Sequence, residues 1–157
     1  MPQNILGTAR VQVAKPKVLT DEGKRSFFMI KVVAAIIEKD GKVLYCRRGP
    51  GGNCPALWEF PGGKIEKGET PFEAIIREIR EELSAEIEPS GIFCEYSFSY
   101  PEKEIYFYFI RAKLLSEKIE PTFHSEIKWL SPSEAENLEF CPADISAAEK
   151  LKGEYKK

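Results

Sequence analysis

The apolar and polar residues of this chain alternate in segments that predict both strands and helices. Asp40-Gly41 is a strong two-residue hairpin signal, and it separates two runs of strand-like residues. The segments with apolar, aromatic or β-branched runs typical of strands are 29–37, 42–47, 92–100, 105–114 and 127–130. Helical periodicity covers 70–83, and 143–151 has the pattern of a closing helix. This order of elements places the chain in the α/β or α+β class.

The helix expected over 70–83 has a well-defined start. Thr70 suits the cap, Pro71 suits the first helical position, and Glu73 completes a capping box with Thr70. At about 100° per residue, one arc of this helix is apolar and is expected to face the core; it consists of Phe72, Ile75, Ile76, Ile79 and Leu83. A second arc carries Glu78, Glu81 and Glu82, with Ala74 and Ala85 between them.

Carboxylates at these spacings repel one another, and a bound cation is one way to offset the repulsion. Ligand sets made only of oxygen favour Mg²⁺ or Mn²⁺ over zinc. Before the helix, Gly62, Gly63 and Gly68 permit positive φ and a close approach of the backbone to a metal or phosphate. Lys64 and Arg77 are candidates to hold phosphate oxygens or to pair with the glutamates. These parts suit the hydrolysis of a phosphoanhydride, and a solvated glutamate-rich helix face is the alternative.

Composition narrows the classes of function without selecting one. A chain of 157 residues with 43% apolar content fits one globular domain, and no apolar run approaches the roughly 18 residues that span a bilayer. A net charge of −2 without a long basic run argues against binding of long nucleic acid. The N-terminus lacks the order of a signal peptide, and the cysteines are widely spaced, so we expect reduced thiols in a cytoplasmic protein. The single histidine, His124, is expected to be a loop residue and not a catalyst.

The residues around the helix resemble the signature of the Nudix hydrolase family, G-x5-E-x7-R-E-U-x-E-E-x-G-U, in which U is a bulky aliphatic residue. The positions in register are Gly63, Glu69, Arg77, Glu78, Ile79, Glu81 and Glu82. Ser84 stands where the last glycine belongs, and Ala85 stands where a bulkier aliphatic is expected. Glycine there would ease the exit from the helix, so the departures concern the local backbone more than the chemistry. A wider similarity to the MutT-type branch is carried by 58–66, Arg47-Arg48 and 142–144.

This resemblance implies an α/β fold, the Nudix-type α/β/α sandwich with a mixed β-sheet, over residues 29–152. Residues 1–28 would then be an arm or an extra edge strand, and 153–157 a tail. The implied metal ligands are the Gly62 carbonyl, Glu78, Glu81, Glu82 and Glu126; for Glu126 the alternative is an exposed loop carboxylate. The implied catalytic roles are Glu78 as the base, Arg77 as the residue that orients the glutamates, and Glu69 as their support.

For the base pocket, the matching positions are Arg47 or Arg48, Phe60 against the base, and Asp144 as an acceptor for a base amino group, while Lys64 stays a candidate to hold phosphate oxygens. Their alternative roles are surface arginines, a core aromatic and the cap of the last helix. The implied reaction is Mg²⁺-dependent hydrolysis of a nucleoside triphosphate, such as 8-oxo-dGTP or a CTP-type nucleotide, to the monophosphate and pyrophosphate. The alternatives are a hydrolase of another diphosphate-linked nucleoside and a non-catalytic nucleotide-binding module.

Overall fold

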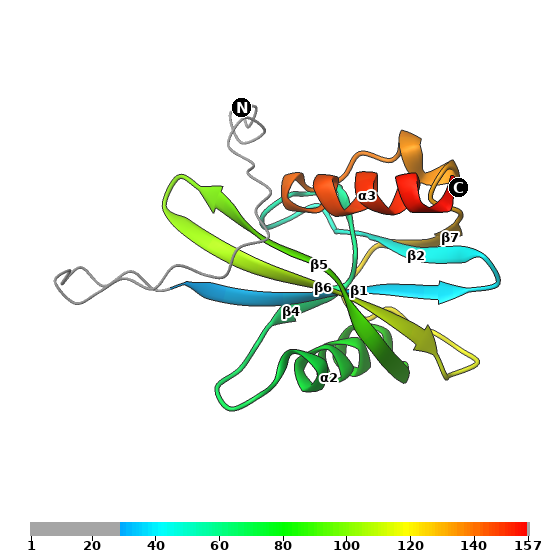
Figure 1. Cartoon of the computed structure of the whole chain (residues 1–157), viewed down its shortest axis with the longest axis horizontal. Helices are drawn as coiled ribbons and strands as arrows, with labels where there is room; N and C mark the ends of the chain where they lie inside the picture. Colours follow the sequence, from blue (N-terminus) through cyan, green and yellow to red (C-terminus); the bar gives the residue numbers. More distant parts are fainter. Residues whose placement is uncertain (1–28, 157) are drawn as a thin grey trace, which may run out of the picture.

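The computed structural model describes residues 29–156, and its centre is a seven-stranded mixed sheet (Figure 1). The expected arm or edge strand over 1–28 lies outside the described residues. The strands are β1 (Ile30–Lys39), β2 (Lys42–Arg47), β3 (Trp58–Glu59), β4 (Gly62–Lys64), β5 (Ile87–Tyr100), β6 (Lys103–Leu114) and β7 (Glu126–Leu130). The main order is β3-β2-β1-β6-β5, in which β1 and β6 run parallel and the other pairs antiparallel. The predicted mixed sheet is therefore confirmed.

The hairpin between β1 and β2 opens almost at once, and this opening creates room for the site. The two strands pair only at Glu38 with Val43 and at Lys39 with Lys42. Beyond that point β4 lies beside β1 in place of β2, with Ala34 opposite Gly62 and Val32 opposite Lys64. The segment predicted as a glycine loop is thus a short strand over 62–64, held at the centre of the sheet.

Two helices cover opposite faces of the sheet, α2 (Pro71–Leu83) on one side and α3 (Ile145–Tyr155) on the other (Figure 1). Successive residues of β1 point to opposite faces, so the strand supplies both cores. Ala34 and Ile36 pack in the cluster that includes Leu151 of α3, whereas Val33 and Ala35 pack in the cluster of α2. This confirms the three-layer sandwich.

Helix α2 begins as its sequence predicts. Thr70 accepts a hydrogen bond from the Glu73 amide, and the Glu73 carboxylate accepts one from the Thr70 amide, which completes the capping box. The buried residues are Ala74, Ile75, Ile79 and Leu83. Our assignment of Phe72 to the core is wrong, because Phe72 lies in the first turn, ahead of the buried stripe, and is 41% exposed.

Other boundaries differ from the pattern in the sequence. Strand β5 begins at Ile87, before the expected 92, because irregular pairing around Pro89 and Gly91 lets the strand continue through residues that weaken its pattern. Helix α3 reaches Tyr155, whose hydroxyl donates to Glu38, so most of the expected tail over 153–157 is helical. Among residues 29–156, no helix is long and apolar enough to cross a membrane.

Candidate active site

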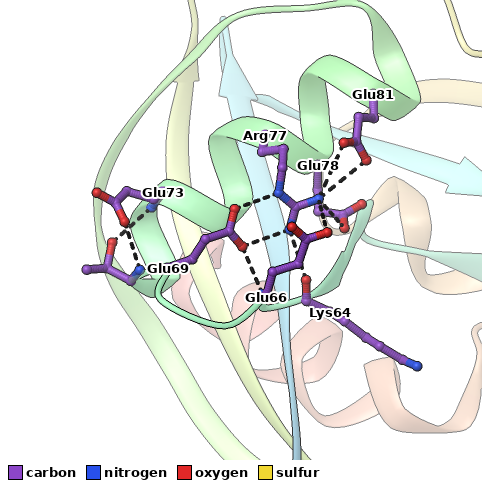
Figure 2. A network of polar contacts seen from close by, with 8 residues as sticks. Lys64, Glu66, Glu69, Glu73, Arg77, Glu78 and Glu81 are labelled. Atoms are coloured by element: carbon purple, nitrogen blue, oxygen red, sulfur yellow. Dashed lines mark hydrogen bonds and ion pairs between the residues drawn. The ribbon is translucent and has the colours of Figure 1, made fainter.

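The guanidinium of Arg77 is the centre of a carboxylate network on α2 and the preceding turn (Figure 2). It pairs with Glu69 through two short contacts of 2.6 and 2.8 Å, and with Glu78 at 3.0 Å. A weaker contact of 3.4 Å reaches Glu81, and Nη2 donates to the Lys64 carbonyl at 3.1 Å. The hydrogen bond from Arg77 is the main cause that lowers the pKa of Glu69 to about 2. The structure therefore brings Glu69, Glu78 and Arg77 together as expected.

The three glutamates of the second arc differ in burial. Glu81 has a side chain that is 59% exposed, whereas that of Glu78 is 13% exposed. Burial raises the pKa of Glu78, against the opposing effect of Arg77. Burial raises the pKa of Glu82 further, to about 8, and the charges of Glu59 and Glu78 add to the effect. Of this arc, only Glu78 and Glu82 are thus carboxylates held against the protein.

Glu82 is the residue whose surroundings best fit a bound cation. Its Oε1 atom is buried and has no hydrogen-bond partner, while the Gly62 amide donates to the carboxylate. A buried acceptor without a partner is costly, and a divalent cation with oxygen ligands removes that cost. Cysteine, histidine and acidic side chains within residues 29–156 form no ready-made metal cluster. The residues that suit a divalent cation are therefore Glu82 and, beside it, Glu78.

Gly62 and Gly63 are required by close packing, and not by positive φ as we expected. A Cβ on Gly62 would overlap the Val33 carbonyl oxygen of β1. A Cβ on Gly63 would lie 2.5 Å from both carboxylate oxygens of Glu78. Only Gly68, of the three, has a positive φ, at 86°. The absence of side chains on β4 is thus what lets α2 place its carboxylates against the sheet.

A cavity of about 200 Å³ adjoins the glutamates, because Gly62 and Gly63 form part of its wall. Arg48, Phe60 and Asp144, three of the residues proposed from the sequence to bind substrate, also line it. Arg47 does not line the cavity; its guanidinium is partly exposed and contacts Glu126 at 3.4 Å. Exposed Lys64 does not line it either, and its ammonium points away from Arg77 (Figure 2).

Asp144 does not cap α3, so our alternative role for it is wrong. It stands before the helix without a capping hydrogen bond, because its carboxylate accepts from the Phe60 amide at 3.0 Å. Burial, and then the charge of Glu59, raise its pKa well above the usual range. Phe60 both lines the cavity and packs in the core, where it stacks on Phe140.

Glu59 is the site residue that the sequence did not reveal. Its carboxylate contacts Arg48 at 3.3 Å and His124 Nε2 at 2.9 Å, and it lines the cavity. His124 lies in a loop as expected, but it is buried, and its Nδ1 has no hydrogen-bond partner. The only signal in the sequence was the alternation in Trp58-Glu59-Phe60. It places the Glu59 side chain on the opposite face of this segment from its two aromatic neighbours, which are buried.

The end of α2 explains how the chain accommodates Ser84. Ser84 adopts the left-handed conformation with φ 54° and ψ 38°, the conformation for which glycine is usual. A distant segment provides hydrogen-bond donors for the last carbonyls of the helix. The Thr122 amide donates to the Glu82 backbone carbonyl, and the Glu120 amide donates to the Leu83 backbone carbonyl. Ala85, the other departure, is buried.

Comparison with known proteins assigns this geometry to a family. The model of the NUDIX domain matches residues 28–151. The chain belongs to the Nudix family. Nudix proteins generally use divalent cations, which agrees with the unpartnered Glu82 oxygen. Two similar relatives are a CTP pyrophosphohydrolase of Escherichia coli K12, with 36% identity over 77% of this chain and 90% of the relative, and an 8-oxo-dGTP diphosphatase of Haemophilus influenzae, with 32% identity over 80% and 93%.

Solved structures of Nudix proteins share the fold. The E. coli ORF135 protein in solution matches with a TM-score of 0.73 and 34% identity, over 81% of this chain and 91% of that one. The MutT protein from Methanosarcina mazei matches with a TM-score of 0.72 and 26% identity, over 83% and 98%. The expected MutT-type similarity is thus confirmed.

Proposed function

We propose that this chain hydrolyses a nucleoside triphosphate to the monophosphate and pyrophosphate, with Mg²⁺ as its cation and Mn²⁺ as a substitute. The observation that carries the proposal is the double role of Gly62 and Gly63. These residues wall the cavity on one side and contact the Glu78 and Glu82 carboxylates on the other. A base in the cavity therefore has its polyphosphate directed toward the carboxylates of α2.

The roles of the carboxylates follow from their surroundings. Glu82, Glu81 and the Gly62 carbonyl would hold the cation, with Glu126 as a further ligand. A divalent cation supplies charge neutralisation for the polyphosphate. Glu78 accepts the proton of the attacking water, because it is largely buried, is close to the cavity wall and has a raised pKa. Arg77 keeps Glu78 in place through the contact of 3.0 Å and is itself fixed by Glu69.

The cavity favours a base with an exocyclic amino group. Two carboxyl groups, Glu59 and Asp144, line it. Each of these carboxyl groups has oxygens that can accept a hydrogen bond from an exocyclic amino group, the role expected of Asp144. Cytosine offers such a donor in its N4–H₂ group. CTP-type nucleotides are therefore the first substrates to test and 8-oxo-dGTP the second, in line with the names of the two relatives.

Arg48 and Phe60 complete the proposed substrate contacts. The Arg48 guanidinium is held by Glu59 and by the Asn53 carbonyl at 2.8 Å, so it enters the cavity in a fixed orientation.

The partner is a small nucleotide and not a long nucleic acid, because the chain lacks a long basic run. The free cysteines suit the reducing cytoplasm, where we place the protein.

A substrate panel with a matched pair of variants tests the function. The protein is incubated with Mg²⁺ and CTP, dCTP, 8-oxo-dGTP, a nucleoside diphosphate sugar or a dinucleoside polyphosphate, and products are identified by mass. We expect monophosphate and pyrophosphate, and about a 10²- to 10⁴-fold loss of kcat in Glu78→Gln, since a general base contributes that much. Glu73→Gln makes the same change on the same helix and keeps a capping-box residue, so its activity should stay at the wild-type level.

Each other outcome points to a different conclusion. Products from the diphosphate sugar or the dinucleotide alone would favour the related hydrolase. Binding without turnover of any nucleotide would favour the non-catalytic module. Pyrophosphate release by Glu78→Gln at the wild-type rate would reject the assignment of the base.

A further inference from the structure

Two cysteines lie side by side where the wall of the cavity is made by segments far apart in the sequence. Cys54 belongs to the entrance loop, which we define as residues 48–57 between β2 and β3. Cys141 immediately precedes the short 3₁₀ turn Pro142–Asp144. Their thiols are close enough to influence each other's pKa, Cys141 Sγ also contacts Glu59 Oε1 at 3.9 Å, and both residues line the cavity of about 200 Å³. The pair is thus a vicinal dithiol at the proposed substrate site.

Backbone hydrogen bonds on both sides of Trp58 hold the pair in position. The Trp58 amide donates to the Glu139 carbonyl at 2.9 Å, and the Cys141 amide donates to the Trp58 carbonyl at 2.8 Å. The Leu57 amide donates to the Cys54 carbonyl at 3.2 Å, so the entrance loop turns back toward Trp58. This framework holds the main chain of the two segments that carry Cys54 and Cys141 on either side of Trp58.

The two thiols have unlike surroundings, which suit a nucleophile and a resolving partner. The hydrogen bond with Cys141 and the charge of Arg48 lower the pKa of Cys54, against the effect of burial. The pKa of Cys141 is raised by the same hydrogen bond and by burial. Cys54 is also partly exposed, whereas Cys141 is 5% exposed. A partly exposed thiol of lowered pKa is the one that oxidants attack first.

The remaining cysteines offer no comparable pair. Burial raises the pKa of the Cys46 thiol well above its usual range and that of Cys94 to about 11. Cys46 lies on β2 in the α2 core and Cys94 on β5 against the α3 core. They serve as internal controls, since the same chain exposes them to the same oxidant.

We propose that Cys54 and Cys141 form a reversible intramolecular disulfide, which ties the entrance loop to the segment before α3 and closes the cavity. The oxidant is hydrogen peroxide or an organic hydroperoxide. The Cys54 thiolate attacks the peroxide oxygen, which breaks the O–O bond and gives a sulfenic acid and hydroxide or alkoxide. The Cys141 sulfur then attacks Cys54 and its proton leaves with the departing oxygen as water. With hydrogen peroxide, two thiols become one disulfide and two waters, and a thiol reductant reverses the change.

The bond requires a movement that the entrance loop can make. Hydrogen-bonded sulfurs must approach to about 2.05 Å, and the residues before Cys54 are exposed and include Gly51 and Gly52. Such a movement carries Asn53, whose carbonyl holds the Arg48 guanidinium at 2.8 Å. Oxidation thereby alters both the volume of the cavity and the orientation of its arginine.

Peptide mapping tests the disulfide without reference to activity. The full chain is treated with hydrogen peroxide, blocked with an alkylating reagent under denaturing conditions and digested with trypsin. Before blocking, the intact chain should lose about 2 Da, and after digestion we expect a crosslink between tryptic peptides 49–64 and 129–150 that dithiothreitol reverses. Cys54→Ser and Cys141→Ser should each abolish the crosslink, whereas Cys94→Ser should retain it. A crosslink to Cys46 or Cys94, a disulfide between two chains, or overoxidised Cys54 without a crosslink would overturn the proposal.

The effect on the site rests on the proposed function and has its own measurement. Nucleotide turnover of the oxidised chain should fall at least tenfold and return after reduction, and Cys54→Ser should keep its own untreated rate through the same treatment. A crosslinked chain with unchanged turnover would overturn the closing of the cavity. A chain that crosslinks but hydrolyses no nucleotide even when reduced would instead contradict the proposed function, so the two failures are distinguishable.

Discussion

The contact between Gly63 and Glu78 is the one in which the smallest change should have the largest effect on catalysis. A methyl group on Gly63 would lie 2.5 Å from both oxygens of the Glu78 carboxylate and closer still to their shared carbon. Ordinary contact requires roughly 3.5 Å, so the carboxylate must withdraw by about 1 Å. Gly63→Ala therefore displaces the proposed base without removing it.

The expected magnitude follows from this displacement. A misplacement of about 1 Å can cost on the order of 10²-fold in rate, which corresponds to about 2.7 kcal/mol in the activation free energy. The effect on folding should be much smaller, because the obstructed atoms are the far end of a flexible side chain. Gly62→Ala should instead destabilise the fold, because the atoms in its way belong to the backbone. Its methyl group would meet the Val33 carbonyl and lie 2.7 Å from the Ala34 Cα atom.

A double-mutant cycle separates displacement of Glu78 from any other cause. The rate of pyrophosphate release is measured for Gly63→Ala, Glu78→Gln and the double variant, with the Tm of each. If Gly63→Ala acts through Glu78, it should cost little in the Glu78→Gln background. Gly153→Ala on α3, where a methyl group meets nothing within 4 Å, is the control and should leave the rate unchanged. Equal losses from Gly63→Ala in both backgrounds, or a wild-type rate for Gly63→Ala, would refute the reasoning.

Two further predictions concern Glu82 and Ser84, at the C-terminal end of α2. In metal-free protein, the pKa of Glu82 is about 8 against an ordinary 4.5, so the folded state binds the proton more tightly. The contribution of Glu82 to the free energy of unfolding should therefore be largest below pH 4.5 and should fall by up to about 4 to 5 kcal/mol toward pH 8. Denaturation in a chelator measures this fall, which Glu82→Gln should flatten, and Mg²⁺ at pH 8 should raise the Tm of the wild type more than that of Glu82→Gln. Ser84→Gly should raise the Tm by roughly 2 °C, about 0.5 to 1 kcal/mol, because glycine adopts the positive φ of 54° without strain. An unchanged or lower Tm, with Ser84→Ala as the comparison, would show that this cap holds no strain.

Local signals in the sequence predicted the parts of the fold that local interactions determine. The capping box of Thr70 and Glu73 and the Asp40-Gly41 hairpin both involve residues within a few positions of each other, and both are confirmed. Phe72 was misassigned because periodicity gives the direction of a side chain but not where the sheet under the helix begins. Strand β4 was missed because two of its three residues are glycines, which have low strand propensity.

The candidate site likewise has contacts that the local sequence predicts and contacts that it does not. The contacts of Arg77 with Glu69 and Glu78 arise within one helix and its preceding turn, so the spacing in the sequence was sufficient. Glu59 and Asp144 meet through β3 and the turn before α3, and no local pattern indicates that meeting. Asp144 in particular has the spacing of a helix cap, and only the distant Phe60 amide reveals its other role.

The burial of Glu82 shows why tertiary structure, and not the helix alone, sets the chemistry of the site. Glu81 and Glu82 are neighbours on one arc of α2, yet Glu81 stays in solvent while the Oε1 atom of Glu82 is buried without a partner. The difference arises from β4, which occupies the opening between β1 and β2 and covers only part of the arc. Because its glycines leave no side chains in the way, the strand buries the carboxylate yet cannot neutralise it. The fold thus carries an unfavourable charge that a divalent cation would relieve, so the same contact that weakens the metal-free protein should strengthen its affinity for the metal.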